Sequence, residues 1–254
     1  MATYQKRGQK RSNKAQSKQN PNVESATAEV FETLDSTASK TESIVAKYQN
    51  HILVIVGTIV FITLGYLGYE KFVIEPKANE AVSELNQAQY YFEIALNSSN
   101  SDSLYKRALN GGEGRYGFLD IIENYKDTPA SKLATYSAGM SYLNIKDYEN
   151  AIKYLDQFDS DDIMLSALAK GAIGDAFAQL GQTQEAYDYY VQAFNASSNS
   201  YSTPKYLYKA GMTGAELGKN SNAIKFFKRI KEEFPKVSEA QLVDVQIGRL
   251  ENIK

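Results

Sequence analysis

Few residues of this chain have side chains that could carry out chemistry. The 254 residues include no cysteine and a single histidine, His51. Disulfides, thiol nucleophiles and iron–sulfur clusters are therefore excluded, and one histidine cannot supply the imidazole pairs that most zinc sites use. No carboxylate pair, Ser–His–Asp set or metal-binding cluster stands out along the sequence. The composition therefore predicts a binding protein with neither enzymatic activity nor a cofactor.

Two short segments resemble parts of ligand-binding loops. Residues 159–162 read Asp-Ser-Asp-Asp, like half of a calcium loop, but no glutamate follows at the required spacing. Residues 111–114 read Gly-Gly-Glu-Gly but lack the Lys and the following Ser or Thr of a phosphate-binding loop. We interpret residues 159–162 as a turn in solvent and treat nucleotide binding at 111–114 as the weaker alternative.

Charge is distributed in blocks along the chain. The first six charged residues, all within positions 6–18, are Lys or Arg, and residues 1–22 contain almost nothing apolar. We expect 1–22 to be a disordered basic cytoplasmic tail that attracts anionic lipid, with ribosomal RNA as the less common alternative. Residues 76–254 carry 19 basic and 23 acidic residues, and the resulting net negative charge does not favour binding of nucleic acid.

A long uncharged segment separates these two blocks. Between Lys47 and Glu70 lie 22 uncharged residues, centred on an almost continuous apolar run at 52–64. As a helix this segment would reach about 33 Å, against a hydrocarbon core of about 30 Å. We predict a transmembrane helix over residues 48–71, with a buried core helix as the alternative. The leader is unusually long for a cleaved signal peptide, and no small-x-small cleavage site follows the apolar run.

The basic leader also predicts the orientation of this span. Lys and Arg residues that flank a first span are retained on the cytoplasmic side. The segment is therefore interpreted as an uncleaved signal anchor, with the N-terminus in the cytoplasm and residues 76–254 exported.

Residues 23–47 carry a weaker helical pattern just before the span. Apolar or Thr side chains recur every seven residues in two interleaved sets, which predicts a seam along one helix face. Only about half of these residues are strongly apolar, so we expect the segment to dock on a membrane or a partner, or simply to extend the span as a weak helix. The two sets are Val23, Val30, Thr37 and Ile44, and Thr27, Leu34, Thr41 and Tyr48.

Three glycines, Gly139, Gly174 and Gly211, begin the same pattern of residue types. At fixed offsets after each glycine, similar residue types recur in the three copies: alanine at one offset and mostly large apolar or aromatic residues at the others. The matching residues are Tyr142, Phe177 and Gly214 at three positions after the glycine; Ala151, Ala186 and Ala223 at twelve; Leu155, Tyr190 and Phe227 at sixteen; and Phe158, Ala193 and Ile230 at nineteen.

This spacing resembles the tetratricopeptide repeat (TPR), whose Gly, Tyr, Ala and Phe positions follow it. The resemblance implies helical hairpins in which Gly and Ala let two helices approach closely while large residues fill the gap to the next pair. Gly181 and Gly218 suit a left-handed helix end at the turn within a hairpin. Two departures are that Gly214 replaces the family's Tyr and that the closing Pro is present only in the third repeat, as Pro235.

The pattern predicts an all-α chain, with one N-terminal transmembrane helix followed by a TPR-like α-solenoid over residues 76–254. Residues 78–128 are expected to form a degenerate first hairpin, whose helices are joined by an unusually long connection at 98–114. The remaining elements are repeats at about 132–160, 167–196 and 204–235 and a capping helix at 238–252.

By this resemblance, the first helices of the hairpins line a concave surface that binds peptides or partner proteins. For Tyr136, Met140 and Tyr208 the alternative is packing between helices, since aromatic and Met stripes are usually core. A carboxylate clamp of the chaperone-binding kind is not expected, because only Lys205 and Lys209 keep the needed charge. The expected surface consists of Tyr136, Met140, Leu143, Asp175, Gln179, Lys205, Tyr208, Lys209 and Met212.

The whole plan of basic tail, single span and exported TPR solenoid resembles the bacterial YfgM-type proteins. This resemblance implies a single-pass protein of the bacterial inner membrane whose C-terminal domain lies in the periplasm. It implies an ancillary factor of the Sec translocon that links translocon subunits to a membrane-anchored periplasmic peptidyl-prolyl isomerase chaperone, or that binds emerging polypeptides. The alternative is a scaffold for envelope or cell-surface machinery without translocon contact.

Overall fold

The computed structural model describes residues 26–98 and 101–252, and within these residues the chain is almost entirely helical. Among them are eleven α-helices and one π-helical turn, and the only β-type pairing is an isolated bridge between Gly112 and Arg115. The predicted all-α class is confirmed. The basic tail at 1–22 and the first seam residue, Val23, lie outside the described residues. Contacts divide the chain into two units, residues 1–66 and residues 67–254.

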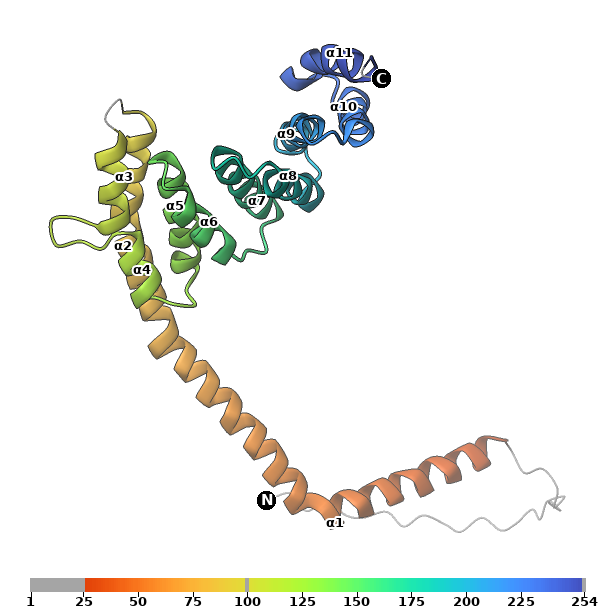
Figure 1. Cartoon of the computed structure of the whole chain (residues 1–254). Helices are drawn as coiled ribbons and strands as arrows, with labels where there is room; N and C mark the ends of the chain where they lie inside the picture. Colours follow the sequence, from red (N-terminus) through yellow and green to blue (C-terminus); the bar gives the residue numbers. More distant parts are fainter. Residues whose placement is uncertain (1–25, 99–100, 253–254) are drawn as a thin grey trace, which may run out of the picture. The chain divides into compact units, whose positions relative to one another are not determined.

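The first unit contains most of helix α1 (Ala26–Tyr69), which is drawn in orange in Figure 1. This helix is long and apolar enough to cross a membrane, as judged by length and composition. Every side chain at positions 52–64 is exposed, since no part of the chain that the structure describes covers it. The hydroxyls of Thr58 and Thr63 donate to main-chain oxygens one turn earlier, at 2.8 Å each, so these two polar groups are satisfied within the helix.

The second unit begins with the π-helical turn η1 (Glu70–Ile74) and the helices α2 (Glu75–Leu96), α3 (Ser101–Asn110) and α4 (Phe118–Asn124). The prediction of a long connection without a helix at 98–114 is therefore wrong, because α3 occupies most of that segment. The Ser and Asn residues around α3 obscured the helical spacing of its buried residues, which are Tyr105, Ala108 and Leu109.

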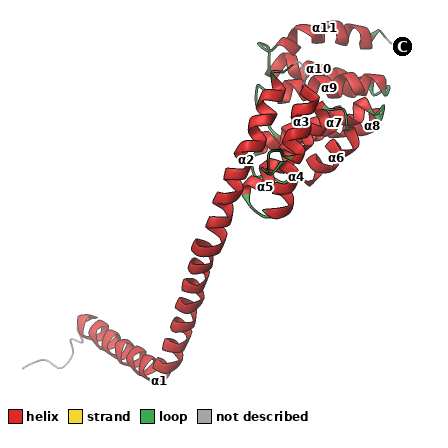
Figure 2. Ribbon diagram, turned by 90° about the vertical axis from the view of Figure 1, so that its left-hand side faces the viewer, coloured by secondary structure: helices red, strands yellow, loops and turns green. Residues whose placement is uncertain are grey.

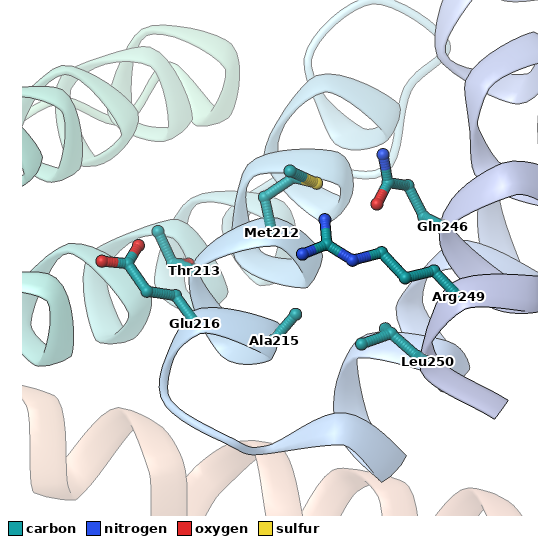
Figure 3. Close-up of a pocket in the computed structure, with 7 residues that line it drawn as sticks. All are labelled: Met212, Thr213, Ala215, Glu216, Gln246, Arg249 and Leu250. Atoms are coloured by element: carbon teal, nitrogen blue, oxygen red, sulfur yellow. The ribbon is translucent and has the colours of Figure 1, made fainter. Parts of the chain in front are cut away.

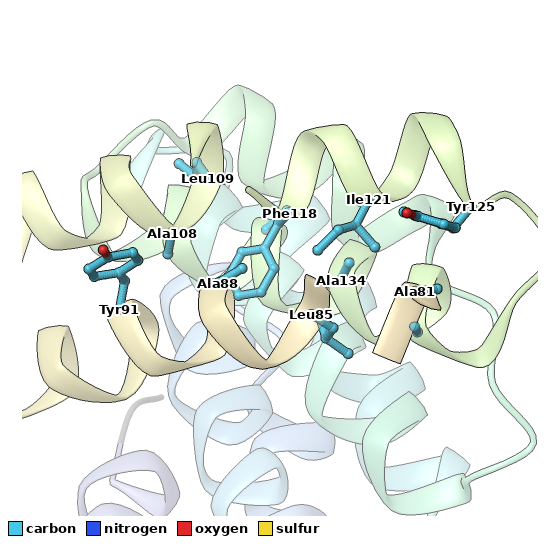
Figure 4. Close-up of a cluster of buried hydrophobic side chains, with 12 residues drawn as sticks. Ala81, Leu85, Ala88, Tyr91, Ala108, Leu109, Phe118, Ile121, Tyr125 and Ala134 are labelled. Carbon is cyan, nitrogen blue, oxygen red and sulfur yellow. The ribbon is translucent and has the colours of Figure 1, made fainter. Parts of the chain in front are cut away.

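These helices and α5 (Pro129–Asn144) share one apolar core. Figure 4 shows Ala81, Leu85 and Ala88 of α2 packed beneath Phe118 and Ile121 of α4. Four helices thus meet where a two-helix hairpin was expected, because α3 adds a second apolar face against α2 and α5.

From α5 onward the helices form consecutive antiparallel pairs, which Figures 1 and 2 show as a stack. Each helix packs mainly on the helices before and after it, and the first helices of some neighbouring pairs also touch, as in the contacts α5–α7 and α9–α11. The remaining helices are α6 (Tyr148–Gln157), α7 (Ile163–Gln179), α8 (Thr183–Ala196), α9 (Thr203–Glu216), α10 (Asn220–Glu233) and α11 (Ser238–Glu251).

At the three predicted glycines the two helices of each pair approach each other closely. A Cβ atom added to Gly139 would lie 2.5 Å from Leu155, and the corresponding distances are 2.6 Å from Gly174 to Tyr190 and 2.4 Å from Gly211 to Phe227. These distances are far below ordinary carbon contacts, so only glycine fits. The alanines twelve positions after each glycine, Ala151, Ala186 and Ala223, are all fully buried. The offsets predicted from the sequence are the actual packing contacts of the hairpins.

The turn inside each hairpin has a residue in the left-handed backbone conformation at the same position. Lys146, Gly181 and Gly218 have φ angles of 65°, 72° and 74°, and each lies seven positions after the close-approach glycine. The N–H of the next residue reaches back to a carbonyl five positions earlier in all three turns, as in a Schellman motif. The prediction for Gly181 and Gly218 is confirmed, and Lys146 fills the equivalent position without the freedom of glycine.

Candidate functional site

The first helices α5, α7, α9 and α11 line two hollows in the second unit. The central hollow lies between the α5–α6 turn and helices α7, α8 and α9, with a volume of about 510 Å³. The terminal hollow lies between α9 and α11, with a volume of about 320 Å³. The central hollow is lined by Leu143, Asn144, Lys146, Tyr148, Asp175, Ala178, Gln179, Tyr190 and Lys209.

A three-residue polar network lies in the central hollow. The Lys209 ammonium group forms an ion pair with Asp175, and the Tyr190 hydroxyl donates a hydrogen bond of 2.7 Å to the same Asp175 oxygen. The Lys209 and Asp175 side chains are 31% and 32% exposed, so the pair is accessible from solvent without being fully solvated. Burial, and then the Asp175 carboxylate, raise the pKa of Tyr190, which keeps its hydroxyl protonated as a donor.

Hairpin packing positions this network. Gly174 admits the Tyr190 ring against α7, and Asp175 is the next residue along the helix. On the other side, Tyr206 of α9 lies against Gly171, and its ring stacks on that of Tyr190 with centroids 6.4 Å apart. The network therefore joins two hairpins at a position that their core contacts determine.

The chemistry of the central hollow suits recognition of a polypeptide. Asp175 and Lys209 neutralise each other, Lys146 contributes an exposed cation, and the side chains of Asn144, Tyr148 and Gln179 add hydrogen-bond donors and acceptors at the rim. Tyr148 and Gln179 are themselves 3.4 Å apart, between the hydroxyl and the amide oxygen. Amide groups of an extended chain match such uncharged polar groups.

The terminal hollow combines charged and apolar groups. Figure 3 shows the Arg249 side chain extending from α11 toward Met212 of α9, with Leu250 below, while the Glu216 side chain lies beside Thr213 and points away from Arg249. None of the ion pairs found among the described residues includes Arg249. An anionic or amide oxygen of a partner would therefore find an available guanidinium here.

The nine predicted surface residues do not all lie together. Leu143, Asp175, Gln179 and Lys209 line the central hollow, and Met212 lines the terminal hollow. Lys205 is exposed on α9 with its ammonium 5.7 Å from the centre of the Tyr206 ring. The other three residues, Tyr136, Met140 and Tyr208, contact the apolar core clusters between helices.

These three residues illustrate the packing alternative. The Tyr136 ring lies 5.2 Å from that of Phe158, and the Tyr208 ring lies 5.8 Å from that of Phe227. Met140 packs against the same cluster as Tyr136. Partly buried side chains of this kind support the surface from below more than they present a free face to a ligand.

Sequence reasoning missed part of both hollows. Tyr190 was noticed only as a packing residue, although a tyrosine in a core needs a partner for its hydroxyl. Gly248 follows Gly211 by 37 residues, the same interval as from Gly174 to Gly211, so α11 begins one further copy of the pattern. Arg249 is therefore equivalent to Asp175 and Met212, each of which follows its glycine directly. Extending the repeat once more would have found the terminal hollow.

Among residues 26–98 and 101–252, no group of three or more His, Asp or Glu side chains is arranged to hold a metal ion.

Comparison with known proteins gives one family. The family model described as T7SS, ESX-1 secretion system protein EccA1, N-terminal domain, matches residues 110–246, which is more than half of the chain. This is a TPR-like helical family. The match runs from the end of α3 into α11, so it includes the whole central hollow and all of the terminal hollow except Arg249 and Leu250. The comparison with curated proteins gives no match.

Proposed function

The chain belongs to the family of the EccA1 N-terminal domain, a TPR-like protein-interaction fold, and from this membership we propose that it is a non-enzymatic, membrane-anchored scaffold for protein partners. The central hollow is the observation that carries the proposal. It is open and polar, it lies on the row of first helices, and its ion pair and hydrogen bonds are fixed by the hairpin packing.

We propose that the partner-binding surface comprises both hollows. Gln179 in the central hollow and Met212 in the terminal hollow present exposed side chains, Lys209 is half-buried in the central hollow, and Arg249 adds an exposed cation. The remaining proposed members are Tyr136, Met140, Leu143, Asp175, Lys205 and Tyr208, of which Tyr136, Met140 and Tyr208 act mainly by supporting the surface.

The membrane anchor in this proposal is the apolar part of α1. Its length and composition suit a span, and the basic leader favours a cytoplasmic N-terminus. The solenoid then lies on the periplasmic face of a bacterial inner membrane. A phosphatase fused to the C-terminus tests this orientation directly, because it is active only if that end is exported. A fusion that is inactive but stable in the membrane would contradict it.

Within this scaffold role we propose an ancillary function at the Sec translocon. The solenoid would hold a membrane-anchored periplasmic peptidyl-prolyl isomerase chaperone, or an emerging polypeptide, beside the channel. The matched family is named for a secretion-system protein, which supports a place beside machinery that exports proteins. Tethering keeps the surface close to the membrane, so that weak binding suffices.

Copurification from detergent-solubilised membranes tests this function. Gln179→Trp places a bulky ring in the central hollow at an exposed position, so the fold should survive. Lys225→Trp on α10 is the matched control, since Lys225 is also exposed but lines neither hollow. We expect translocon subunits or the chaperone with the wild-type protein and with Lys225→Trp, and their loss with Gln179→Trp. Equal recovery with both variants would contradict the proposed surface.

The alternative is a scaffold for assembly of envelope or cell-surface machinery without translocon contact. The same purification distinguishes the two, because it identifies the partners. Recovery of envelope-assembly proteins that depends on Gln179, without any translocon subunit, would favour this second function.

A further inference from the structure

The part of α1 that precedes the apolar span presents a second apolar face. Val30, Leu34, Ile44 and Val45 are 56%, 59%, 57% and 50% exposed, and Phe31 is 66% exposed. At about 100° per residue these side chains fall on one side of the helix, within about 140° of its circumference. None of the described residues covers them, and a face of this size requires an explanation.

Two threonines complete this face without adding exposed polarity. The Thr37 hydroxyl donates to the Thr33 carbonyl at 2.6 Å, and the Thr41 hydroxyl donates to the Thr37 carbonyl at 2.8 Å. Thr58 and Thr63 in the apolar span use the same bond to the preceding turn. A hydroxyl satisfied in this way leaves its methyl group to an apolar environment, which makes Thr compatible with lipid.

The opposite side of the same segment is polar. By helical spacing, Glu32, Ser36 and Ser39 lie on that side, Asp35 and Glu42 lie at its edge next to Phe31, and all five polar residues are exposed. The segment therefore has a clear division between an apolar and a water-facing side.

The connection to the span determines what can cover the apolar face. Residues 26–69 form one helix, and no linker separates Val45 and Tyr48 from the uncharged residues that follow. The helix bends sharply within its length (Figures 1 and 2), so that one arm can lie along a surface which the other arm crosses. If those residues cross a bilayer, the apolar face is held at the surface of that bilayer at very high local concentration. The six basic residues at positions 6–18 add attraction to anionic lipid, and they outnumber the three acids on the polar side.

The width of the face favours lipid over another helix. A coiled-coil partner requires a narrow seam of two positions per heptad, and here Thr37 and Thr41 weaken that seam. Phe31 and Val45 lie beside the seam, where they would stay exposed in a helix pair but would be buried in a bilayer. We propose that residues 30–47 of α1 form an interfacial helix lying on the anionic cytoplasmic surface of the membrane. This proposal rests on the membrane anchor proposed above.

The absence of cysteine from the sequence allows a direct test with single-cysteine variants. Leu34→Cys and Ile44→Cys place a polarity-sensitive dye on the apolar face, and Ser36→Cys and Ser39→Cys place it on the polar side. The full chain is reconstituted in vesicles of phosphatidylcholine with or without phosphatidylglycerol. We expect a blue shift and strong quenching by nitroxide-labelled lipid at positions 34 and 44 only, with both effects reduced when phosphatidylglycerol is omitted.

Each other outcome overturns the proposal. Equal dye spectra at all four positions would show that the face is not in lipid. Disulfide cross-links between copies through Leu34→Cys, without quenching by lipid, would show that a second helix covers it. Ile59→Cys in the span distinguishes failure of the interfacial helix from failure of the membrane anchor. A dye at position 59 should be quenched by nitroxide-labelled lipid whenever the span crosses the bilayer. Loss of quenching at position 59 would refute the anchor itself.

Discussion

Gly174 and Tyr190 are packed so closely that a Cβ atom on Gly174 would lie 2.6 Å from the Tyr190 ring. The same tyrosine donates a 2.7 Å hydrogen bond to Asp175, the residue after that glycine. One contact therefore determines both the spacing of helices α7 and α8 and the position of the polar network in the central hollow. Changes that disturb the packing should disturb the surface as well.

Replacing this glycine should destabilise the protein. Gly174→Ala forces the Tyr190 ring away from α7, and overpacking of this kind costs about 1–3 kcal/mol of unfolding free energy. Gly248→Ala is the matched control, because its Cβ would meet no atom within 4 Å. There the gain in helix propensity predicts stabilisation of up to about 1 kcal/mol. Denaturant unfolding measures both, and equal effects would contradict the close-approach interpretation.

The turn at Lys146 should be improved by glycine. Lys146 has a φ of 65° where the other two hairpins have Gly181 and Gly218. A left-handed conformation costs a non-glycine residue about 1–2 kcal/mol, so Lys146→Gly should stabilise the protein by up to about 1 kcal/mol after the entropy of the unfolded chain is subtracted. Gly181→Ala should destabilise it by about 1 kcal/mol although its Cβ would meet open space. Melting temperatures that move in the opposite directions would show that φ at this turn does not matter.

Asp175 and Lys209 should be energetically coupled. Because both side chains are about one-third exposed, we expect a coupling free energy of at most about 1 kcal/mol in a double-mutant cycle of Asp175→Asn and Lys209→Met. Tyr190→Phe should cost about 1–2 kcal/mol separately, since it removes a hydrogen bond to a carboxylate. The Asp175–Lys209 coupling should weaken in high salt, and salt-independent coupling would indicate a different origin.

Alkaline pH should destabilise the folded protein. Burial raises the pKa of Tyr190 and Tyr206 above the usual 10.0, and burial together with Glu80 raises that of Tyr125 to about 12. The unfolded chain therefore loses these protons first, so the free energy of unfolding is unaffected below pH 10 and falls as the pH rises beyond it. Unfolding measured from about pH 9 to about pH 11 should show this fall, and Tyr206→Phe should make it shallower. An unchanged slope in Tyr206→Phe would mean that Tyr206 ionises normally in the folded state.

The sequence predicted the hairpins better than the surface that they carry. Gly139, Gly174 and Gly211 could be recognised because a close approach tolerates no other residue, and their large partners recur sixteen positions later. Helix α3 was missed because Tyr105, Ala108 and Leu109 are surrounded by residues typical of loops. A short amphipathic helix of this kind is stabilised by packing on α2 and α5, which the local sequence does not reveal.

Surface residues were harder to predict, because helical spacing shows which side chains share a face but not how far neighbouring helices bury them. Asp175 and Lys209 both line the central hollow, yet their shared partner Tyr190 comes from a second helix. Tyr136 and Met140 occupy the same face and contact a core cluster between α5, α6 and α7. Whether such a residue is free depends on the neighbouring hairpin, which no single helix pattern specifies.

Site-specific photo-crosslinking in intact membranes tests the central claim most directly. A photoreactive amino acid replaces Gln179 in the central hollow or, as the control, Lys225 on α10. We expect covalent adducts from position 179 to translocon subunits, to the periplasmic chaperone or to an emerging polypeptide, and none of them from position 225. Absence of adducts from position 179, or the same adducts from both positions, would contradict a scaffold that binds its partners through this hollow.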